Sequence, residues 1–306
     1  MKTWIRSLRE KRRLFVSRTS DTTFARILLT PTAFMVMVLG IFPIVYSFGL
    51  SFFRYRLNRP GAPSFVGLGN YIRMVNDAEF WASMGRTLYF TVTSVGLTVL
   101  LGLAIALLLR RDIKGKTMFV TLLLIPWAIP KVVSGLIWRW IFDGSYGILN
   151  ALAVKFGIVE GYQWWFNKSP IVALTLVVIV EMWKRAPFSA IMMLAGLNDI
   201  PAHLYRAAEI DGARSWHKFK YVTLPGIKHI LMVVLILETA WSLKTFDTIY
   251  VLTSGGPGTS TTVAYYYAQK QAFNYLDLGY GSALAYTITL AVIGLTIFYS
   301  RALRNA

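Results

Sequence analysis

Three long stretches without a single charged residue constrain what this chain can fold into. They cover residues 27–53, 87–109 and 278–300. A helix needs roughly 20 mostly apolar residues to cross about 30 Å of hydrocarbon, and each stretch is long enough. The sequence therefore predicts three membrane-spanning helices, which are the first, second and last of the chain.

Three further apolar segments, at about 117–141, 170–197 and 227–251, carry isolated charges. Ionisable side chains are costly in lipid, so we expect these helices to face protein or a wet cavity. Charged residues make up 15% of the whole chain, whereas soluble domains carry about 25%. We therefore expect an all-α, polytopic membrane protein with six transmembrane helices.

Several other classes of protein are excluded by composition and spacing. A net charge of +18 is typical of nucleic-acid-binding proteins, but those present a basic face on a soluble fold. The chain has no cysteine, which excludes disulfides, thiolate metal sites and a Cys nucleophile. His203, His217 and His229 lack zinc-ligand spacing. "RRDIKGKT" (Arg110–Thr117) lacks the first glycine of a phosphate-binding loop.

The distribution of Lys and Arg predicts the orientation in the membrane. Most of those outside the spans fall before the first span, after the second, after the fourth and at the end. By the positive-inside rule these segments and both termini are cytoplasmic. The first apolar run is too long for a signal peptide. We expect a basic cytoplasmic segment (1–26), a first transmembrane helix with an outer loop (27–84), and a five-helix core with a cytoplasmic loop at 199–226 (85–306).

That loop contains "LYRAAEIDGARSWHKFKYVTLPG" (Leu204–Gly226). Asp199 is suited to cap a first helix, and the residues Leu204, Ala207, Ala208 and Asp211 share one thin face of it. Gly212 can adopt positive φ and turn the chain. A second short helix is expected to run to about Tyr221. Pro225 stops it before the fifth span. The product is a helix–turn–helix that either docks a protein or lies on anionic lipid.

Two helical stripes mark a candidate substrate pathway. Polar and aromatic residues recur at i, i+3, i+4 and i+7 on the fourth and fifth spans. Such stripes suit a water-filled cavity, where sugar hydroxyls pair with charges and sugar C–H faces stack on Trp. The alternative is simple pairing of Glu181 with Lys184 and of Lys244 with Asp247. The stripe residues are Glu181, Lys184, Arg185 and Phe188, then Glu238, Trp241, Ser242 and Thr245.

The loop resembles a known motif. "AAEIDGA", followed by Leu224–Pro225, resembles the cytoplasmic signature loop of binding-protein-dependent ABC importer permeases. In that family the loop forms coupling helices that sit in a cleft of the ATPase subunit. The family's leading Glu corresponds to Arg206, and the neighbouring Glu209 is the candidate to replace it. The resemblance implies ATPase coupling by Arg206, Ala207, Ala208, Glu209, Asp211, Gly212, Ala213, Leu224 and Pro225.

Three other stretches resemble sugar-importing members of the same family. They are "FVGLGNYIRM" (65–74), "LTSGGPGTST" (252–261) and "AFNYLDLGYGSALAY" (272–286). The resemblance is to the carbohydrate-uptake branch, with its maltose and glycerol-3-phosphate permeases. It implies a type I ABC importer permease fold in the bacterial plasma (inner) membrane. It also implies that the outer loop at Gly255, Gly256 and Pro257 contacts the binding protein.

The resemblance further implies the partners and cofactors of the chain. It implies a heterodimer with a second permease, two ATP-binding subunits that hold ATP and Mg, and an extracytoplasmic sugar-binding protein. This chain then binds no cofactor and no metal and catalyses no reaction. One alternative is a secondary transporter that works as a homodimer. Another is a membrane enzyme such as a glycosyltransferase, which the scattered single acids disfavour.

Overall fold

The computed structural model describes residues 21–59, 61–111 and 113–304, and almost all of its regular structure is helical. The predicted cytoplasmic segment 1–26 lies mostly outside these residues. The elements are α2 (Asp21–Met35), η1 (Val36–Ile41), α3 (Phe42–Leu50), β1 (Phe53–Arg54), β2 (Ser64–Phe65), α4 (Gly69–Val75), α5 (Ala78–Leu109), α6 (Lys116–Ala128), α7 (Lys131–Ile141), α8 (Ile148–Lys155), η2 (Trp165–Asn167), α9 (Pro170–Asn198), α10 (Ala202–Ile210), α11 (Ser215–Lys218), η3 (Phe219–Thr223), α12 (Leu224–Gly226), α13 (Lys228–Leu243), α14 (Asp247–Thr253), α15 (Ala264–Gln269), η4 (Lys270–Asn274) and α16 (Leu278–Arg304).

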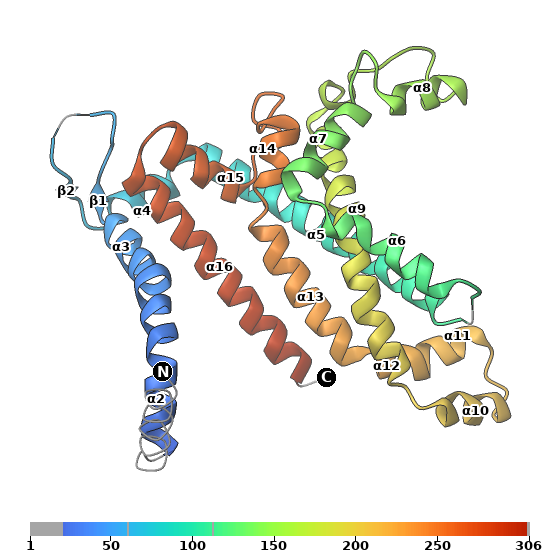
Figure 1. Cartoon of the computed structure of the whole chain (residues 1–306). Coiled ribbons are helices and arrows are strands. Elements are labelled where there is room, and N and C mark those ends of the chain that lie inside the picture. Colours follow the sequence, from blue (N-terminus) through green and yellow to red (C-terminus); the bar gives the residue numbers. More distant parts are fainter. Residues whose placement is uncertain (1–20, 60, 112, 305–306) are drawn as a thin grey trace, which may run out of the picture.

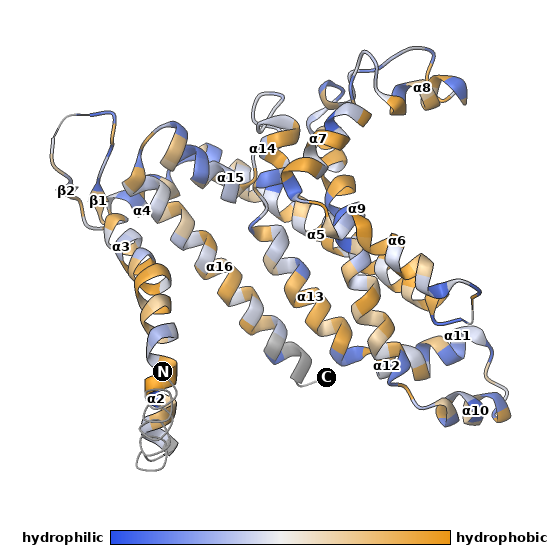
Figure 2. Cartoon of the chain, in the orientation of Figure 1, coloured by the Kyte–Doolittle hydropathy of each residue, from blue (hydrophilic) through white to orange (hydrophobic). Residues whose placement is uncertain are grey.

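The long helices run between two ends of the molecule (Figure 1). One end carries the short antiparallel pair β1–β2, with α4, α7, α14 and α15; the other carries α10 and α11. Helices α5, α9 and α13 pack on one another, whereas α2 leans away from them. Hydrophobic residues cover much of α6, α9 and α13, whereas α10 carries hydrophobic and hydrophilic residues side by side (Figure 2).

The predicted first, second and last spans are confirmed as long apolar helices. In the described part of the chain, Thr22–Leu50, Ala78–Leu109 and Leu278–Tyr299 are long and apolar enough to cross a membrane. The count rises to five if each of two bent helix pairs forms one span. Helix α9, with 29 residues, is long enough but carries three charged residues. The count of six therefore stays a prediction.

Two predicted spans are not single helices. The third breaks after Ala128, and α6 meets α7 at 94°. Ile129 is extended there (ψ 134°) because it precedes Pro130, which disfavours helical backbone before it. The fifth breaks between α13, which ends at Leu243, and α14, which begins at Asp247. Both breaks lie beside the charged residues of α9, as described below.

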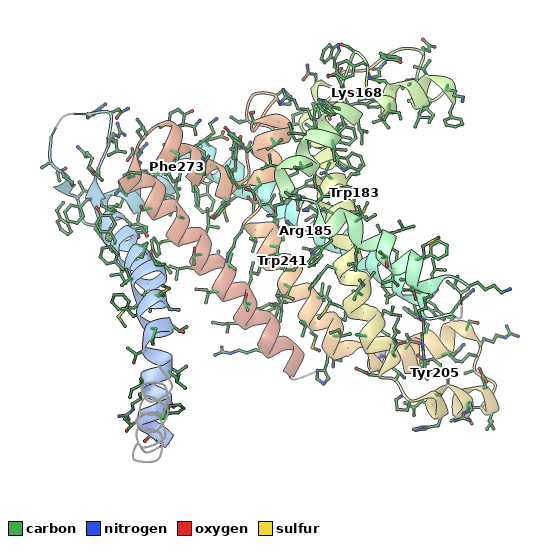
Figure 3. The ribbon with its side chains drawn as sticks, viewed as in Figure 1. Lys168, Trp183, Arg185, Tyr205, Trp241 and Phe273 are labelled. Atoms are coloured by element: carbon green, nitrogen blue, oxygen red, sulfur yellow. The ribbon has the colours of Figure 1, made fainter. Side chains whose placement is uncertain are left out.

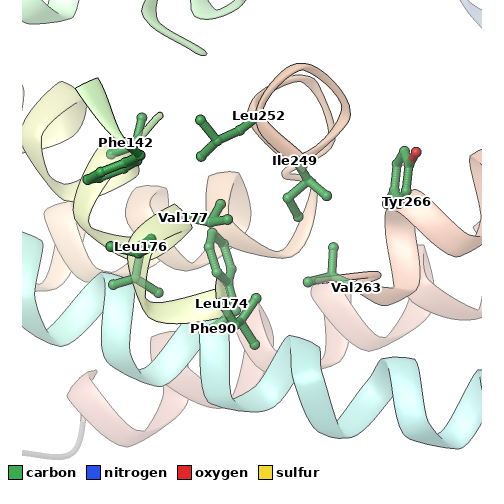
Figure 4. Close-up of a cluster of buried hydrophobic side chains, with 11 residues drawn as sticks. Phe90, Phe142, Leu174, Leu176, Val177, Ile249, Leu252, Val263 and Tyr266 are labelled. Atoms are coloured by element: carbon green, nitrogen blue, oxygen red, sulfur yellow. The ribbon is translucent and has the colours of Figure 1, made fainter. Parts of the chain in front are cut away.

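The apolar core has two main layers along α5 and α9. One layer joins α5 and α9 to α14 and α15 and contains Phe90, Val177 and Ile249 (Figure 4). The other joins α5 and α9 to α13 and contains Met193 and Val234. The predicted spans 2, 4 and 5 are thereby fixed against one another at two levels.

Asp77 joins the ends of several helices. It caps α5 by accepting from the N–H groups of Glu79 (3.0 Å) and Phe80 (3.3 Å). Its other oxygen accepts from the hydroxyls of Tyr267 (2.6 Å) and Tyr280 (2.5 Å). Burial raises the pKa of Asp77, but these hydrogen bonds outweigh it and leave the pKa below its usual value. A charged carboxylate therefore holds α15 and α16 to α5.

Replacing Gly102 with Val should destabilise the contact between α5 and α9. A Cβ at Gly102 would lie 2.8 Å from Cβ of Ser189 and 3.1 Å from the main-chain N of Ala190. Overpacking of this kind costs about 1–3 kcal/mol. A Cβ at Gly96 on the same helix meets nothing within 4 Å, so Gly96→Val is the matched control. Thermal unfolding in detergent measures both; equal melting temperatures would contradict the close packing.

Candidate functional site

A buried cluster of charged side chains lies where α5, α9 and α13 pack together. Arg185 on α9 is at its centre. Its Nη2 lies 2.5 Å from Oε2 of Glu181, and its Nη1 lies 3.7 Å from Oε2 of Glu238. Nη2 also donates to Oγ1 of Thr245 at 2.8 Å. Glu181 and Glu238 are 0% and 1% exposed, so one guanidinium compensates two buried carboxylates.

Hydroxyl groups from the surrounding helices supply further hydrogen-bond partners. Ser189 donates to Oε1 of Glu238 at 3.0 Å, and Thr248 on α14 donates to Oε1 of Glu181. Ser242 on α13 bonds with two hydroxyls of α5 at 3.0 and 3.2 Å. Along α9 the cluster lies between the two apolar layers of the core. The charged and hydroxyl side chains therefore connect four helices between these two layers.

Lys184 does not form the alternative pair with Glu181, which bonds to Arg185 instead. The Lys184 ammonium is directed to the break between α6 and α7. The last carbonyls of a helix have no intrahelical partner, and a cation is favourable at that end. A 7% exposed lysine thus stabilises the broken third span. It donates to the carbonyl oxygens of Pro126 (3.3 Å), Trp127 (3.4 Å) and Ile129.

The alternative pair of Lys244 with Asp247 does not form either. Asp247, at the start of α14, pairs with Lys131, at the start of α7, at 3.3 Å. Both side chains are about 40% exposed. The two helices that follow the two breaks are therefore joined to each other by a solvent-accessible ion pair.

Aromatic rings form the accessible side of this region. The rings of Trp127 and Phe188 stack at 6.0 Å, and Phe188 meets Trp241 edge-on at 5.1 Å. Trp127 and Trp241 are 48% and 37% exposed. Figure 3 places Trp241 beside Arg185 in the middle of the molecule. Of the predicted pathway residues, Phe188 and Trp241 reach this surface, while the six polar ones are buried behind it. Trp127 was not among the predicted pathway residues. Its position after Pro126, in a span that carries charges, could have indicated it.

Loop 199–226 forms the predicted helix–turn–helix. Gly212 has φ +74° and directly follows the end of α10. The N–H of Gly212 bonds to the carbonyl of Glu209 at 3.0 Å, and that of Ala213 to the carbonyl of Ala208 at 2.8 Å. This is the hydrogen-bond pattern of a Schellman motif, with glycine at its left-handed position. The predicted turn at Gly212 is confirmed.

Side chains brace this loop against the long helices. Tyr205 on α10 shares a hydrogen bond with Thr223 (2.9 Å) and accepts one from Arg110 (2.6 Å), whose guanidinium also lies 4.3 Å from the Tyr205 ring centre. Figure 3 labels Tyr205 at this end of the molecule. Glu209 pairs with Lys218 at 2.9 Å, so the two short helices are also joined. The loop is therefore attached to the end of α5.

The outer face of the loop is accessible. Ile210 and Trp216 are 88% and 67% exposed. Ile210 was not among the predicted coupling residues, although an apolar residue beside the glycine turn was a signal for it. Among the predicted residues Ala208 and Ala213 are half-buried, and the exposed ones are Arg206, Ala207, Glu209, Asp211, Gly212, Leu224 and Pro225.

Two details of the predicted loop are wrong. Asp199 ends α9 and does not cap α10, whose N-cap is Pro201 with no side-chain hydrogen bond. Pro225 does not stop the second helix, because it occupies the first turn of α12, where its missing N–H is tolerated. The chain bends by 68° two residues after Pro225, at Ile227, whose side chain is fully buried.

The glycine-rich loop after α14 is folded tightly on itself. Gly255 is buried at φ +84°, and its carbonyl accepts from the N–H of Thr261 and from Oγ1 of Thr262, both at 3.1 Å. A Cβ there would lie 2.6 Å from Tyr266. Gly256 is half-buried and Pro257 is exposed. Of the three predicted contact residues, Pro257 therefore offers the most surface.

Comparison with known proteins identifies the family. Residues 98–305 match the family of binding-protein-dependent transport system inner membrane components. The chain belongs to this family. The trehalose/maltose transport system permease protein MalF of Thermococcus litoralis is 40% identical, over 89% of this chain and 91% of that protein. The sulfoquinovosyl glycerol transport system permease protein SmoG of Agrobacterium fabrum is 38% identical, over 93% and 92%.

Solved structures show that the permease has the fold of ABC importer membrane subunits. A chain of a bacterial ABC transporter for alginate import superposes with a TM-score of 0.79, at 20% identity, over 96% of this permease and 99% of that chain. The same kind of transporter bound to its periplasmic protein gives 0.78. The expected type I importer fold is confirmed, and the permease is a multi-pass membrane protein.

Replacing Arg185 with Met should strongly destabilise the permease. Glu181 and Glu238 would then lie buried without their cation, and breaking a buried pair in this way costs about 3–5 kcal/mol. Lys244→Met is the control, since Lys244 is exposed at the same helix break. The measurement is the unfolding temperature in detergent. If the two variants unfold at the same temperature, the cluster does not stabilise the helix packing.

Replacing Gly212 with Val should loosen the end of α10. A β-branched residue at φ +74° is strained, whereas Asn tolerates this conformation, so Gly212→Asn is the matched control. A Cβ at this position meets nothing within 4 Å, so the effect stays local. Hydrogen exchange of the Gly212 and Ala213 region should accelerate in Gly212→Val alone. Equal protection in both variants would contradict the role given to this turn.

Proposed function

We propose that this permease imports a sugar or sugar derivative into a bacterial cell as one membrane subunit of an ATP-driven ABC importer. Its family and the sugar cargoes named for its two relatives support this cargo class. Family membership also favours this function over a homodimeric secondary transporter. The permease itself performs no covalent chemistry on the sugar.

The accessible aromatic side of the buried cluster supports a pathway for sugar. Trp127, Phe188 and Trp241 present rings on which sugar C–H faces stack. The buried charges behind them hold these rings in position, since Lys184 bonds to the carbonyl of Trp127 and Arg185 lies 3.5 Å from that of Trp241. In this proposal the charged residues position the pathway, and the aromatic residues contact the cargo.

The assembly in this proposal contains five chains. The permease pairs with a second, homologous permease, and two ATP-binding subunits hold ATP and Mg on the cytoplasmic side. A sugar-binding protein docks on the outside, where Gly255–Pro257 form a rigid surface for it. Both termini of the permease lie in the cytoplasm.

Loop 199–226 couples the ATPase to the pathway. Its exposed Ile210 and Trp216, together with the thin alanine face, suit a groove on the partner subunit. Arg206 occupies the position of the family's Glu, and it is exposed, so we propose that it meets an acidic group there. Glu209 already forms an ion pair with Lys218, so it is not free to take the place of the missing Glu. Motion of the loop reaches α5 through Tyr205 and α13 through the bend at Ile227.

Uptake into proteoliposomes tests this function. The permease is reconstituted with its partner permease, both ATPases and the binding protein, and labelled trehalose is supplied outside. Accumulation should require internal ATP and the binding protein. Gly212→Val should lower uptake and sugar-stimulated ATP hydrolysis at least about tenfold, the equivalent of 1.4 kcal/mol, while Gly212→Asn retains most of both. Accumulation by this chain alone without ATP would establish the secondary-transport alternative.

A further inference from the structure

A polar and aromatic cavity lies at the opposite end of the molecule from loop 199–226 (Figure 1). It encloses about 350 Å³ between the end of α7, the segment around η2 and the loop after α14. Sites for small molecules have volumes of about 300–1,000 Å³ and combine apolar walls with a few polar groups. The residues that carry the argument are Arg139, Asp143, Gly144, Trp164 and Pro257.

The wall of this cavity is firmly built. A Cβ at Gly144 would lie 2.5 Å from the ring of Trp164, so the indole rests directly on the glycine. Fully buried Asn150 closes the intervening segment. Its Nδ2 donates to the carbonyls of Asp143 (2.9 Å) and Gln163 (3.0 Å), and its Oδ1 accepts from the N–H of Gln163 (3.0 Å). Trp164 is thereby held in place although it is 62% exposed.

The charges at the cavity are balanced and accessible. Arg139 forms no salt bridge among the residues that the structure describes, and neither does Asp143. One oxygen of Asp143 accepts from the N–H groups of Ser145 (2.7 Å) and Tyr146 (3.2 Å). The second oxygen and the Arg139 guanidinium remain for a ligand with both donors and acceptors. An uncharged, hydroxyl-rich molecule fits this pair better than an anion does.

We propose that this cavity is an outer binding site for a neutral sugar, with Trp164 as its stacking surface. The proposal rests on the sugar-import function. The site is separate from the Trp241 face, because the apolar layer that contains Phe90, Val177 and Ile249 lies between them. The site also lies beside Pro257. There it can receive a sugar next to the surface proposed for the binding protein.

Cysteine protection tests this site directly, since the chain has no cysteine of its own. A single cysteine is placed at exposed Asn167 on the cavity rim, and its maleimide labelling is timed in the assembled transporter without ATP. Trehalose, maltose or glucose at about 10 mM should slow labelling about threefold, as a Kd of about 5 mM implies. A cysteine at exposed Asn58 is the control and should show no change.

Variants in the Asn167→Cys background identify the ligand surface. Trp164→Ala should remove the protection, Trp164→Phe should keep part of it, and Trp241→Ala should leave it unchanged. The binding protein is left out of the labelling reaction, because it would cover the cavity rim at Pro257. The proposal is overturned if none of the three sugars protects, or if the Trp164→Ala variant is protected as well as the parent. The readout needs neither ATP nor uptake, so failure here is distinguishable from failure of the import function.

Discussion

The structure depends on one buried arginine between two glutamates. Arg185 joins Glu181 on its own helix to Glu238 on α13, and burial makes each carboxylate dependent on that cation. The hydroxyl groups of Thr245, Ser189 and Thr248 bond to these three charged side chains. Apolar layers above and below keep water from competing, so the helices are fixed at the level where two neighbouring spans break.

The two breaks follow from the same charges. Lys184 bonds to the carbonyls freed at the end of α6, and Arg185 bonds to Thr245 directly after α13. Irregular backbone at membrane depth is tolerated where it is buried in protein or lines a cavity. Here protein side chains satisfy it on one side, and the exposed rings of Trp127 and Trp241 lie on the other. The charged residues of α9 and the breaks in the two neighbouring spans therefore depend on each other.

The sequence predicted the elements whose causes are local. The long stretches without charged residues predicted α5 and α16, and Gly212 predicted the turn of loop 199–226. Both features depend on residues that are close in the chain. The break at Pro130 could also have been predicted, since proline restricts the residue before it. The pairing of Arg185 with Glu238, 53 positions apart, could not. Periodicity placed the polar stripes on the correct faces, but it could not tell a cavity lining from a buried network.

In the function proposed above, the same reasoning favours the aromatic residues over the charged ones as the residues that select the cargo. A charge that already compensates another buried charge loses that partner if it turns to a ligand, which costs several kcal/mol. Phe188 and Trp241 compensate no buried charge, so their rings can change contacts as the helices move. In the proposed mechanism, motion of loop 199–226 reaches Trp241 through α13, which runs unbroken from Lys228 to Leu243.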